Sequence, residues 1–276
     1  MKKLFSIITV MAMVTALLAG CGTKEAGNKG DSDSGSVTEG AKVTNSPAST
    51  DATGDNKLIV GTEAGFAPYE YLEGDKVVGV DMDIAQAIAD AMGKELEIKN
   101  MDFTGALMAV QNGTVDLVAA AVSVDEERKK VMDFSVDYVN STEVVVVNKE
   151  KAAVATADAE GLKGKVIGVQ QGNIADFYVE DNVEAKEIKR YTKFGQAAED
   201  LKNNRIDCIV MDRYPAEDLV KSNPELAILD GTLFEDKYAI AVKKGNTELL
   251  DQINVVIEDL KTNGKIEEFY SNHTSK

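Results

Sequence analysis

The stretch Met101–Tyr138, MDFTGALMAVQNGTVDLVAAAVSVDEERKKVMDFSVDY, decides the fold of this chain. It predicts a short helix that begins near Phe103, a small-residue strand over 116–122, and a charged helix that begins after Ser123. Arg128 lies one turn into that charged helix, just past a strand that ends in alanines. A guanidinium held there could grip a carboxylate through two parallel N–H···O bonds. The alternative for DEERKK is a solvated helix face with an acidic first turn and basic residues after it.

The segments on both sides of this stretch alternate between strand and helix patterns. Before it, LIVGT at 58–62 indicates a buried strand, 81–92 a helix with an acidic start, and ELEIKN a strand. After it, a second series begins at GKVIGVQQGN and reaches another strand at 207–211. This order favours parallel sheets with helices on both faces. The chain is therefore predicted to be an α/β protein of two lobes, with a ligand cleft outside the carboxyl ends of the strands.

The N-terminus has the pattern of a lipoprotein signal peptide. Lys2 and Lys3 precede the uncharged apolar run Leu4–Leu18, and small residues then lead to Cys21. The alternative is a membrane span, but the run is shorter than the roughly 18 residues that a span needs. We predict a signal peptide over 1–20, lipid on Cys21, and an extracytoplasmic protein anchored to the cell membrane.

Composition sets the remaining limits. Residues 21–56 are rich in small polar residues and predict a flexible linker to a body that begins near residue 57. The formal net charge of −17 argues against nucleic acid and against adsorption to anionic lipid as partners. Cys208 is the only cysteine besides Cys21, so no disulfide within the chain is expected. Without a histidine or cysteine cluster, we predict no metal and no cofactor.

Four segments, taken together, resemble one family. They are GTEAGFAPYEY, GVDMDIAQAIA, the stretch 101–138, and GLKGKVIGVQQGN followed by IDCIVMD. They resemble the substrate-binding proteins of polar amino-acid ABC transporters, which are bacterial extracellular solute-binding lipoproteins of family 3. The resemblance covers 57–270.

The resemblance implies a fold and a way of working. The fold would be the type II periplasmic-binding-protein fold, with lobe 1 at 57–139 and 239–276 and lobe 2 at 142–236. Two hinge strands, near 138–142 and 237–238, would join the lobes. A monomer would close its lobes over a polar amino acid and deliver that ligand to an ABC permease.

The resemblance also implies which residues hold the amino-acid backbone of the ligand. Arg128 would hold the α-carboxylate, Ser123 would touch the carboxylate or the α-amino group, and Asp212 would take the α-ammonium. Ala121 would offer a backbone carbonyl, and Asn173 lies at a helix start, where free N–H groups suit an anion. This assignment agrees with the chemistry of a zwitterion, because each of its buried charges needs an opposite partner. The alternative for Asp212 is a helix N-cap, and both roles can hold.

Five further residues would form the pocket for the ligand side chain. Phe66 and Phe103 would sandwich the carbon stem, and Gln170 and Met211 would face it. Glu63 would approach the distal end of a long polar ligand, which favours arginine, lysine or glutamine. From the residues alone, Phe66 could equally be a core residue.

Two other functions share the same scaffold. The first is a sensor module that hands its ligand-bound form to a receptor, and the second is a dehydratase-type enzyme. An enzyme needs a general acid or base poised near neutral pH. The only histidine, His273, lies in the terminal segment SNHTSK, where a disordered, solvated side chain is expected. We therefore predict a binding protein and not an enzyme.

Overall fold

The computed structural model describes residues 56–274. The predicted signal peptide, Cys21 and all but the last residue of the predicted linker lie outside the described residues. Within 56–274, no helix combines the length and the apolar character that crossing a bilayer requires.

The first sheet has five strands and begins with β1 (Lys57–Thr62). Its strand order is β4-β1-β5-β13-β6; β4 and β5 run parallel to β1, and β13 runs antiparallel to both of its neighbours. We call this sheet, with its helices and the β2–β3 hairpin, lobe 1. Its other elements are β2 (Tyr71–Glu73), β3 (Lys76–Val78), α1 (Val80–Ala91), β4 (Glu95–Asn100), α2 (Phe103–Asn112), β5 (Leu117–Val118), α3 (Glu126–Val131), β6 (Met132–Phe134), β13 (Ala241–Lys243), α8 (Thr247–Thr262) and α9 (Lys265–Thr274).

The second sheet has six strands, ordered β11-β7-β10-β8-β9, with β12 paired to β7 beside this path. The strands β10, β8 and β9 run parallel to one another, and β7 runs antiparallel to β10. We call this sheet with its helices lobe 2. Its elements are β7 (Val139–Asn148), α4 (Ala159–Leu162), β8 (Val166–Gln170), α5 (Ile174–Asn182), β9 (Glu187–Tyr191), α6 (Phe194–Lys202), β10 (Cys208–Asp212), α7 (Arg213–Ser222), β11 (Leu226–Ile228) and β12 (Phe234–Tyr238).

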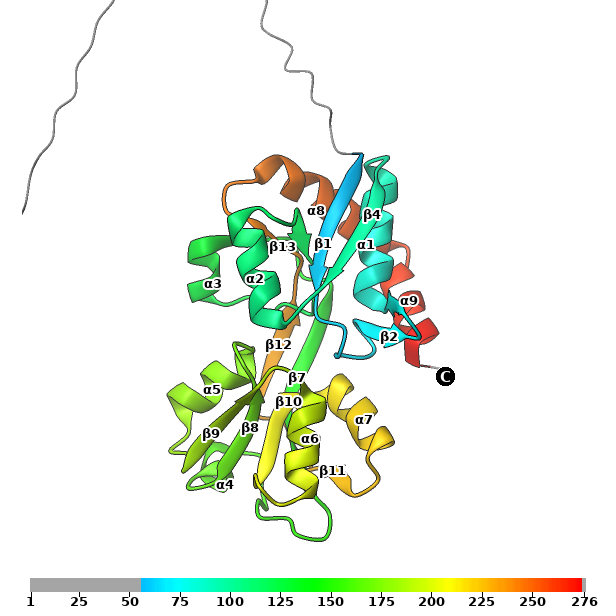
Figure 1. Ribbon diagram of the computed structural model, residues 1–276. Coiled ribbons are helices and arrows are strands. Elements are labelled where there is room, and N and C mark those ends of the chain that lie inside the picture. Colours follow the sequence, from blue (N-terminus) through cyan, green and yellow to red (C-terminus); the bar gives the residue numbers. More distant parts are fainter. Residues whose placement is uncertain (1–55, 275–276) are drawn as a thin grey trace, which may run out of the picture. The chain divides into compact units, whose positions relative to one another are not determined.

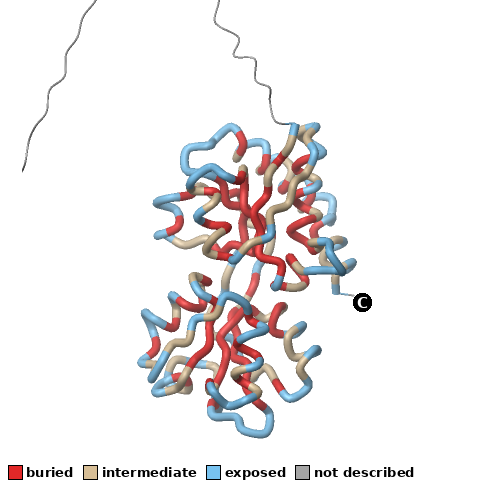
Figure 2. The backbone as a smooth tube through the Cα atoms, in the orientation of Figure 1, coloured by how far each residue is buried: buried red, intermediate tan, exposed pale blue. Residues whose placement is uncertain are grey.

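Two strands carry the chain between the sheets. The chain enters lobe 2 along β7 and leaves it along β12, and Figure 1 shows both strands running between the two groups of elements. They pair antiparallel from Val139 opposite Tyr238 to Glu143 opposite Phe234. Buried residues gather along the strands in both groups (Figure 2). The prediction of two α/β lobes is confirmed.

The segment that leads into α1 is fixed to the start of that helix. Pro68 and Tyr69 accept hydrogen bonds at their carbonyls from the first two N–H groups of the helix, at 3.1 and 3.0 Å. Gly79 precedes the helix with φ 136°, and a Cβ there would lie 2.0 Å from the Tyr69 carbonyl oxygen. The backbone of residues 63–70 is thereby held at the edge of lobe 1.

Two expectations differ from the structure near the C-terminus. The apolar run YAIAV at 238–242 predicts one continuous strand. In the structure the run is divided, since β12 ends at Tyr238 in the second sheet and β13 begins at Ala241 in the first. His273 is not in a solvated tail, since α9 extends to Thr274 and leaves its side chain only 12% exposed. His273 Nδ1 lies 3.0 Å from the Tyr71 hydroxyl, and its Nε2 lies 2.9 Å from Asp83.

Candidate functional site

Arg128 is buried between the two lobes. Asp125 caps α3 by accepting from the backbone N–H groups of Glu127 and Arg128, which fixes the start of the helix. The guanidinium donates from Nη1 to the Ser123 carbonyl at 2.6 Å and from Nη2 to the Gly172 carbonyl of lobe 2 at 2.8 Å. Its Nε lies 3.1 Å from Asp125 Oδ2. Arg128 is therefore not the solvated helix side chain that DEERKK alone allowed.

Aromatic rings flank this guanidinium. Its central carbon lies 5.5 Å from the ring centre of Phe103 in lobe 1 and 5.7 Å from that of Phe177 in lobe 2. Burial lowers the pKa of Arg128, although Asp125, Asp236 and Asp212 oppose this effect. The side chain stays a cation at any physiological pH because an arginine titrates so far above neutrality.

A small cavity between the lobes collects five of the predicted site residues. Its walls come from the ends of β1 and β8 and the starts of α2 and α5, and its side chains leave no water-sized space between them. The residues that line it are Glu63, Phe66, Glu70, Phe103, Ala120, Gln170 and Asn173. Both phenylalanines are buried, so Phe66 belongs to the packed interior and to the cavity wall at once.

Polar contacts across this cavity join the lobes. Gln170 donates from Nε2 to Glu63 Oε2 at 3.1 Å, and Lys193 Nζ lies 3.4 Å from Glu63 Oε1. Asn173 caps α5 by accepting from the Ala175 N–H and lies 3.4 Å from Gln170 Oε1. Burial raises the pKa of Glu63, and the Lys193 charge and the Gln170 hydrogen bond oppose that rise.

Glu70 is a second buried carboxyl at this cavity, and sequence reasoning missed it. It is 1% exposed, and its Oε2 receives no hydrogen bond from any residue that the structure describes. Burial raises its pKa well above the usual range, and the nearby Asp81, Glu63 and Asp212 charges add to that rise. One glutamate between two tyrosines in a loop carries no sequence signal for burial.

Asp212 lies fully buried at the end of β10. It occupies the N-cap position of α7, but its side chain makes no capping hydrogen bond. Instead its Oδ1 accepts from the hydroxyl groups of Tyr238 and Ser141. Burial raises the pKa of Asp212 to about 6. The sequence left two roles open for Asp212, a partner for the ligand ammonium and a side-chain cap of the following helix. In this structure the side chain does not cap α7.

Ser123 and Ala121 lie on the segment between β5 and α3. Ser123 donates from Oγ to Asp236 Oδ2 at 2.5 Å, and its carbonyl holds Arg128. Ala121 has φ 46°, a left-handed conformation that is uncommon outside glycine, and its N–H donates to Asp81 Oδ2 at 2.8 Å. The hydroxyl of Tyr138 donates to the same carboxylate, which ties this segment to the start of β7.

The last predicted residue, Met211, is buried in the hydrophobic core. It is 1% exposed and belongs to the same hydrophobic cluster as Phe66, which lines the small cavity, although Met211 itself is not among the lining residues. Phe194, which was not predicted, packs against Phe66 with ring centres 6.0 Å apart. Phe194 is the first residue of α6, which begins shortly after β9 ends, and Asn173 precedes α5 at the corresponding junction after β8. Attention to the carboxyl ends of the strands could therefore have found Phe194.

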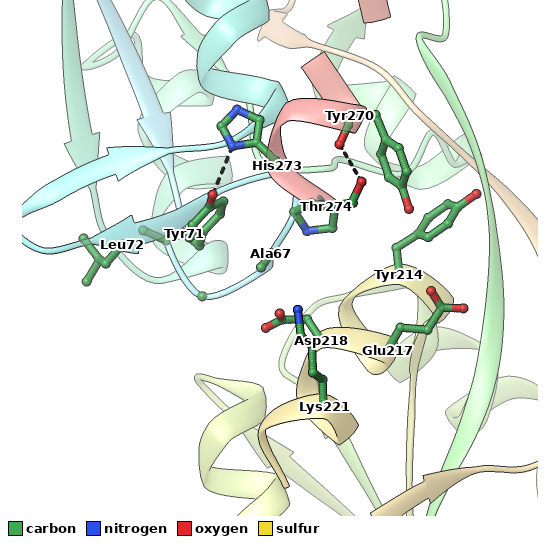
Figure 3. Close-up of a pocket in the computed structure, with 13 residues that line it drawn as sticks. Ala67, Tyr71, Leu72, Tyr214, Glu217, Asp218, Lys221, Tyr270, His273 and Thr274 are labelled. Atoms are coloured by element: carbon green, nitrogen blue, oxygen red, sulfur yellow. Dashed lines mark hydrogen bonds between the residues drawn. The ribbon is translucent and has the colours of Figure 1, made fainter. Parts of the chain in front are cut away.

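A larger hollow of about 590 Å³ lies where α9 and the loop before β2 face α7. Figure 3 shows Tyr270 of α9 beside Tyr214 of α7, and their ring centres are 4.9 Å apart. Glu217, Asp218 and Lys221 form the other wall. The two lobes thus also meet at this tyrosine pair, in addition to their contacts around Arg128 and the small cavity.

Fold and site together define a class of protein. Two α/β lobes are joined by two strands, and a buried cation, buried carboxylates and aromatic side chains meet between them, as in a binding protein that encloses a small ligand. Residues 58–276 match the bacterial extracellular solute-binding proteins, family 3, so this chain belongs to that family.

Relatives and solved structures agree with this membership. The arginine-binding extracellular protein ArtP of Bacillus subtilis (strain 168) is 31% identical, over 97% of this chain and 96% of ArtP. The L-cystine-binding protein TcyJ of Escherichia coli (strain K12) is 31% identical, over 76% of this chain and 79% of its own. The fold is similar to that of the amino acid ABC transporter substrate-binding protein AbpA of Streptococcus pneumoniae bound to L-arginine, with a TM-score of 0.75 and 33% identity, covering 79% of this chain and 94% of AbpA. A mutant of ArgBP from T. maritima also has a TM-score of 0.75, with 35% identity and coverage of 80% and 96%.

Proposed function

We propose that this protein captures a cationic L-amino acid, arginine in the first place, and delivers it to an ABC permease. One observation carries this choice: Glu63 and Glu70 are both buried at one small cavity beside Phe66 and Phe103. Buried carboxylates need a cation, and a guanidinium is planar and can pair with carboxylates through two N–H groups. The arginine-binding relatives support the same choice.

Arg128 would grip the ligand carboxylate by exchanging one partner. In this structure its Nη2 donates to the Gly172 carbonyl of lobe 2. A carboxylate accepts a stronger hydrogen bond from a guanidinium than a neutral carbonyl does, so the ligand would displace Gly172. Asp212 would take the α-ammonium, with Ser123 and the Ala121 carbonyl beside it. Asn173, Gln170 and Met211 complete the proposed set on lobe 2.

Lobe motion would admit and enclose the ligand. The side chains around the small cavity close on one another, so an amino acid can enter only when the lobes separate. We assign 57–139 and 239–276 to lobe 1 and 142–236 to lobe 2, an assignment supported by the membership of the strands in two sheets. β7 and β12 would bend near 138–142 and 237–238 as the lobes move.

The proposal also covers where the protein is located and how it takes part in transport. The sequence pattern around Cys21 supports a lipid anchor that holds a monomeric, extracytoplasmic binding protein at the cell membrane. The family consists of substrate-binding proteins, which supports a role in binding and not in catalysis. Amino-acid transport by an ABC permease follows from the same membership.

A thermal-shift screen of the body from about residue 55, against the twenty amino acids, tests the proposal. At a hundred times its Kd, a ligand stabilises by about 2.7 kcal/mol, which raises Tm by roughly 5–10 °C in a body of this size. We expect arginine to give the largest shift, lysine a smaller one, and glutamate none. Citrulline, which matches arginine in shape without its charge, is the control. An equal response to citrulline would rule out the acidic pocket, and a flat panel on ligand-free protein would rule out the function.

A further inference from the structure

Three strands of lobe 2 present a row of acidic side chains on one face. β7 runs between β10 and β12, with Glu143 opposite Asp212 on one side and Ser141 opposite Asp236 on the other. Residues two apart in a strand face the same side, so Ser141 and Glu143 share this face. One carboxylate oxygen from each of Glu143, Asp212 and Asp236 lies within 4.8 Å of the others.

Hydrogen-bond donors are distributed unequally over these carboxyl groups. Asp212 accepts from Tyr238 and Ser141, and Asp236 accepts from Ser123. Glu143 is 0% exposed, and neither of its oxygens receives a hydrogen bond from any residue among 56–274. A buried carboxylate without a donor is costly, and it is costlier with a second carboxylate directly opposite on the next strand.

A proton between Glu143 and Asp212 removes this cost. Two carboxyl groups that share a site cannot both ionise freely, so one of them keeps its proton and donates it to the other. Burial and then the Asp212 charge raise the pKa of Glu143 well above its usual range. The charged and titratable groups around the pair are Asp236 and Tyr238 of β12, Arg128 and Asp125 of α3 and its cap, Arg213 of α7, and Tyr69 and Glu70 of the loop before β2.

We propose that Glu143 is a further ligand-binding residue, which shares a proton with Asp212 in the unliganded protein and releases it when the ligand ammonium enters. This inference rests on the proposed function, which places that ammonium at Asp212. The ammonium has three N–H donors, and it would replace the single shared proton as the partner of both carboxylates. The O–H bond of Glu143 breaks, its electron pair stays on the carboxylate, and the proton passes to solvent.

The proposal fixes the direction of a pH effect. Release of one proton makes the association constant rise with pH, by up to tenfold per unit, while Glu143 is protonated without ligand and ionised with it. In E143Q the amide resembles the protonated acid but has no proton to release. Its affinity should therefore lie below that of the wild type at high pH, and the two should converge as the pH falls.

Calorimetry of L-arginine binding in phosphate and in Tris at one pH counts the protons released, because the two buffers differ in their heat of protonation. We expect the wild type to release more protons than E143Q, by up to one. Glu63 and Glu70 can also release protons to a cationic side chain, but both are intact in E143Q. The difference between the wild type and E143Q therefore isolates the part of the release that depends on Glu143. Equal proton release by E143Q and the wild type would overturn the proposal.

A second measurement needs no binding. Carbon-13 NMR of the wild type, with glutamate labelled at the side-chain carboxyl and the Glu143 signal assigned by its loss in E143Q, reports the protonation state directly. We expect Glu143 to be protonated at neutral pH without ligand, and to ionise on addition of arginine. An ionised Glu143 in the unliganded protein would overturn the inference. If calorimetry shows no binding of arginine to the wild type, the proposed function is overturned instead. The NMR spectrum of the unliganded protein would still decide whether Glu143 is protonated.

Discussion

Arg128 is held by neighbours that leave its guanidinium little freedom. Its three nitrogens reach Ser123, Gly172 and Asp125, and the rings of Phe103 and Phe177 lie within 6 Å of its central carbon, at 5.5 and 5.7 Å. Among the residues that the structure describes, Gly172 is the one in lobe 2 that accepts a hydrogen bond from Arg128. The proposal has the ligand replace this contact, because its loss leaves the bonds to Ser123 and Asp125 in lobe 1 intact. The fork shape of arginine matters here as much as its charge.

Arg128→Lys should therefore weaken arginine binding, although it keeps the positive charge. The lysine loses one of two charge-assisted hydrogen bonds, a loss of about 1.5–3 kcal/mol, or roughly 10- to 150-fold in Kd. Calorimetric titration of both proteins measures the difference. Arg205→Lys, at an exposed arginine that pairs with Asp200, is the control and should bind normally. A Kd for Arg128→Lys within twofold of the wild type would show that the carboxylate lies elsewhere.

The position of Arg128 could be predicted because it follows a strand whose carboxyl end faces the cleft. Its bond to Gly172 could not, because that contact depends on how the two lobes meet. Glu70 and Glu143 were missed for a related reason. A single acidic residue in a loop, or after the polar residues that open a strand, has the sequence pattern of a solvated side chain, and only the tertiary fold makes it buried.

At the scale of elements, the first turn of α1 organises the segment that leads to Arg128. Asp81 accepts from the Ala121 N–H and from the Tyr138 hydroxyl, so one carboxylate joins α1, the segment after β5 and the start of β7. The hydrogen bond from the Ala121 N–H to Asp81 supports the left-handed backbone conformation of Ala121. A residue that makes no ligand contact thereby sets the path of residues that the proposal places at the ligand.

Asp81→Ala should destabilise the body and weaken ligand binding together. It leaves two buried donors without an acceptor, at about 1–3 kcal/mol each, so Tm should fall by roughly 5–15 °C. Asp81→Asn keeps one acceptor oxygen and should lose less. Asp90→Ala, an exposed position on the same helix, is the control for helix effects and should change Tm little. Thermal melts with and without arginine measure both effects, and a normal Kd in Asp81→Ala would remove the positioning role.

Helices and strands were largely predictable from the sequence because their apolar spacing is regular, as in α1 and β1. The division of the run 238–243 between β12 and β13 could not be predicted, because an uninterrupted apolar run does not show that its two ends belong to different sheets. His273 was assigned to a tail because short polar residues surround it. In the structure α9 packs beside Tyr71 and Asp83, and both residues contact the His273 ring. These contacts fix the side chain of His273, and the residues next to it in the sequence do not reveal them.

At the scale of the whole molecule, buried acids make stability depend on pH. Burial raises the pKa of Asp81 to about 7, and it raises the pKa of Glu70 and Glu143 as well. An acid whose pKa is higher in the folded state binds more protons there than in the unfolded chain, over the range between the two values. Its stabilising contribution is present at low pH and is lost as the pH rises through the folded pKa. The net charge of −17 acts in the same direction.

The unliganded body should therefore melt at a higher temperature at pH 5 than at pH 8. Asp81 alone contributes on the order of 2.5–3 kcal/mol to this difference, or roughly 5–10 °C. Melting curves at several pH values in buffers of equal ionic strength give the slope. In Asp81→Asn the slope should be shallower, because one titrating group is gone. A Tm that rises from pH 5 to pH 8 would contradict the assignment of neutral buried acids.

The tyrosine pair between α7 and α9 has a practical consequence. Tyr214 and Tyr270 belong to different lobes, and Lys221 lies on the same wall as Tyr214 (Figure 3). A fluorescent dye attached through a cysteine at position 221 would face α9 when the lobes are together and water when they part. Cys208 is buried, so a single added thiol could be labelled selectively. The binding protein would then serve as an optical sensor for its own ligand.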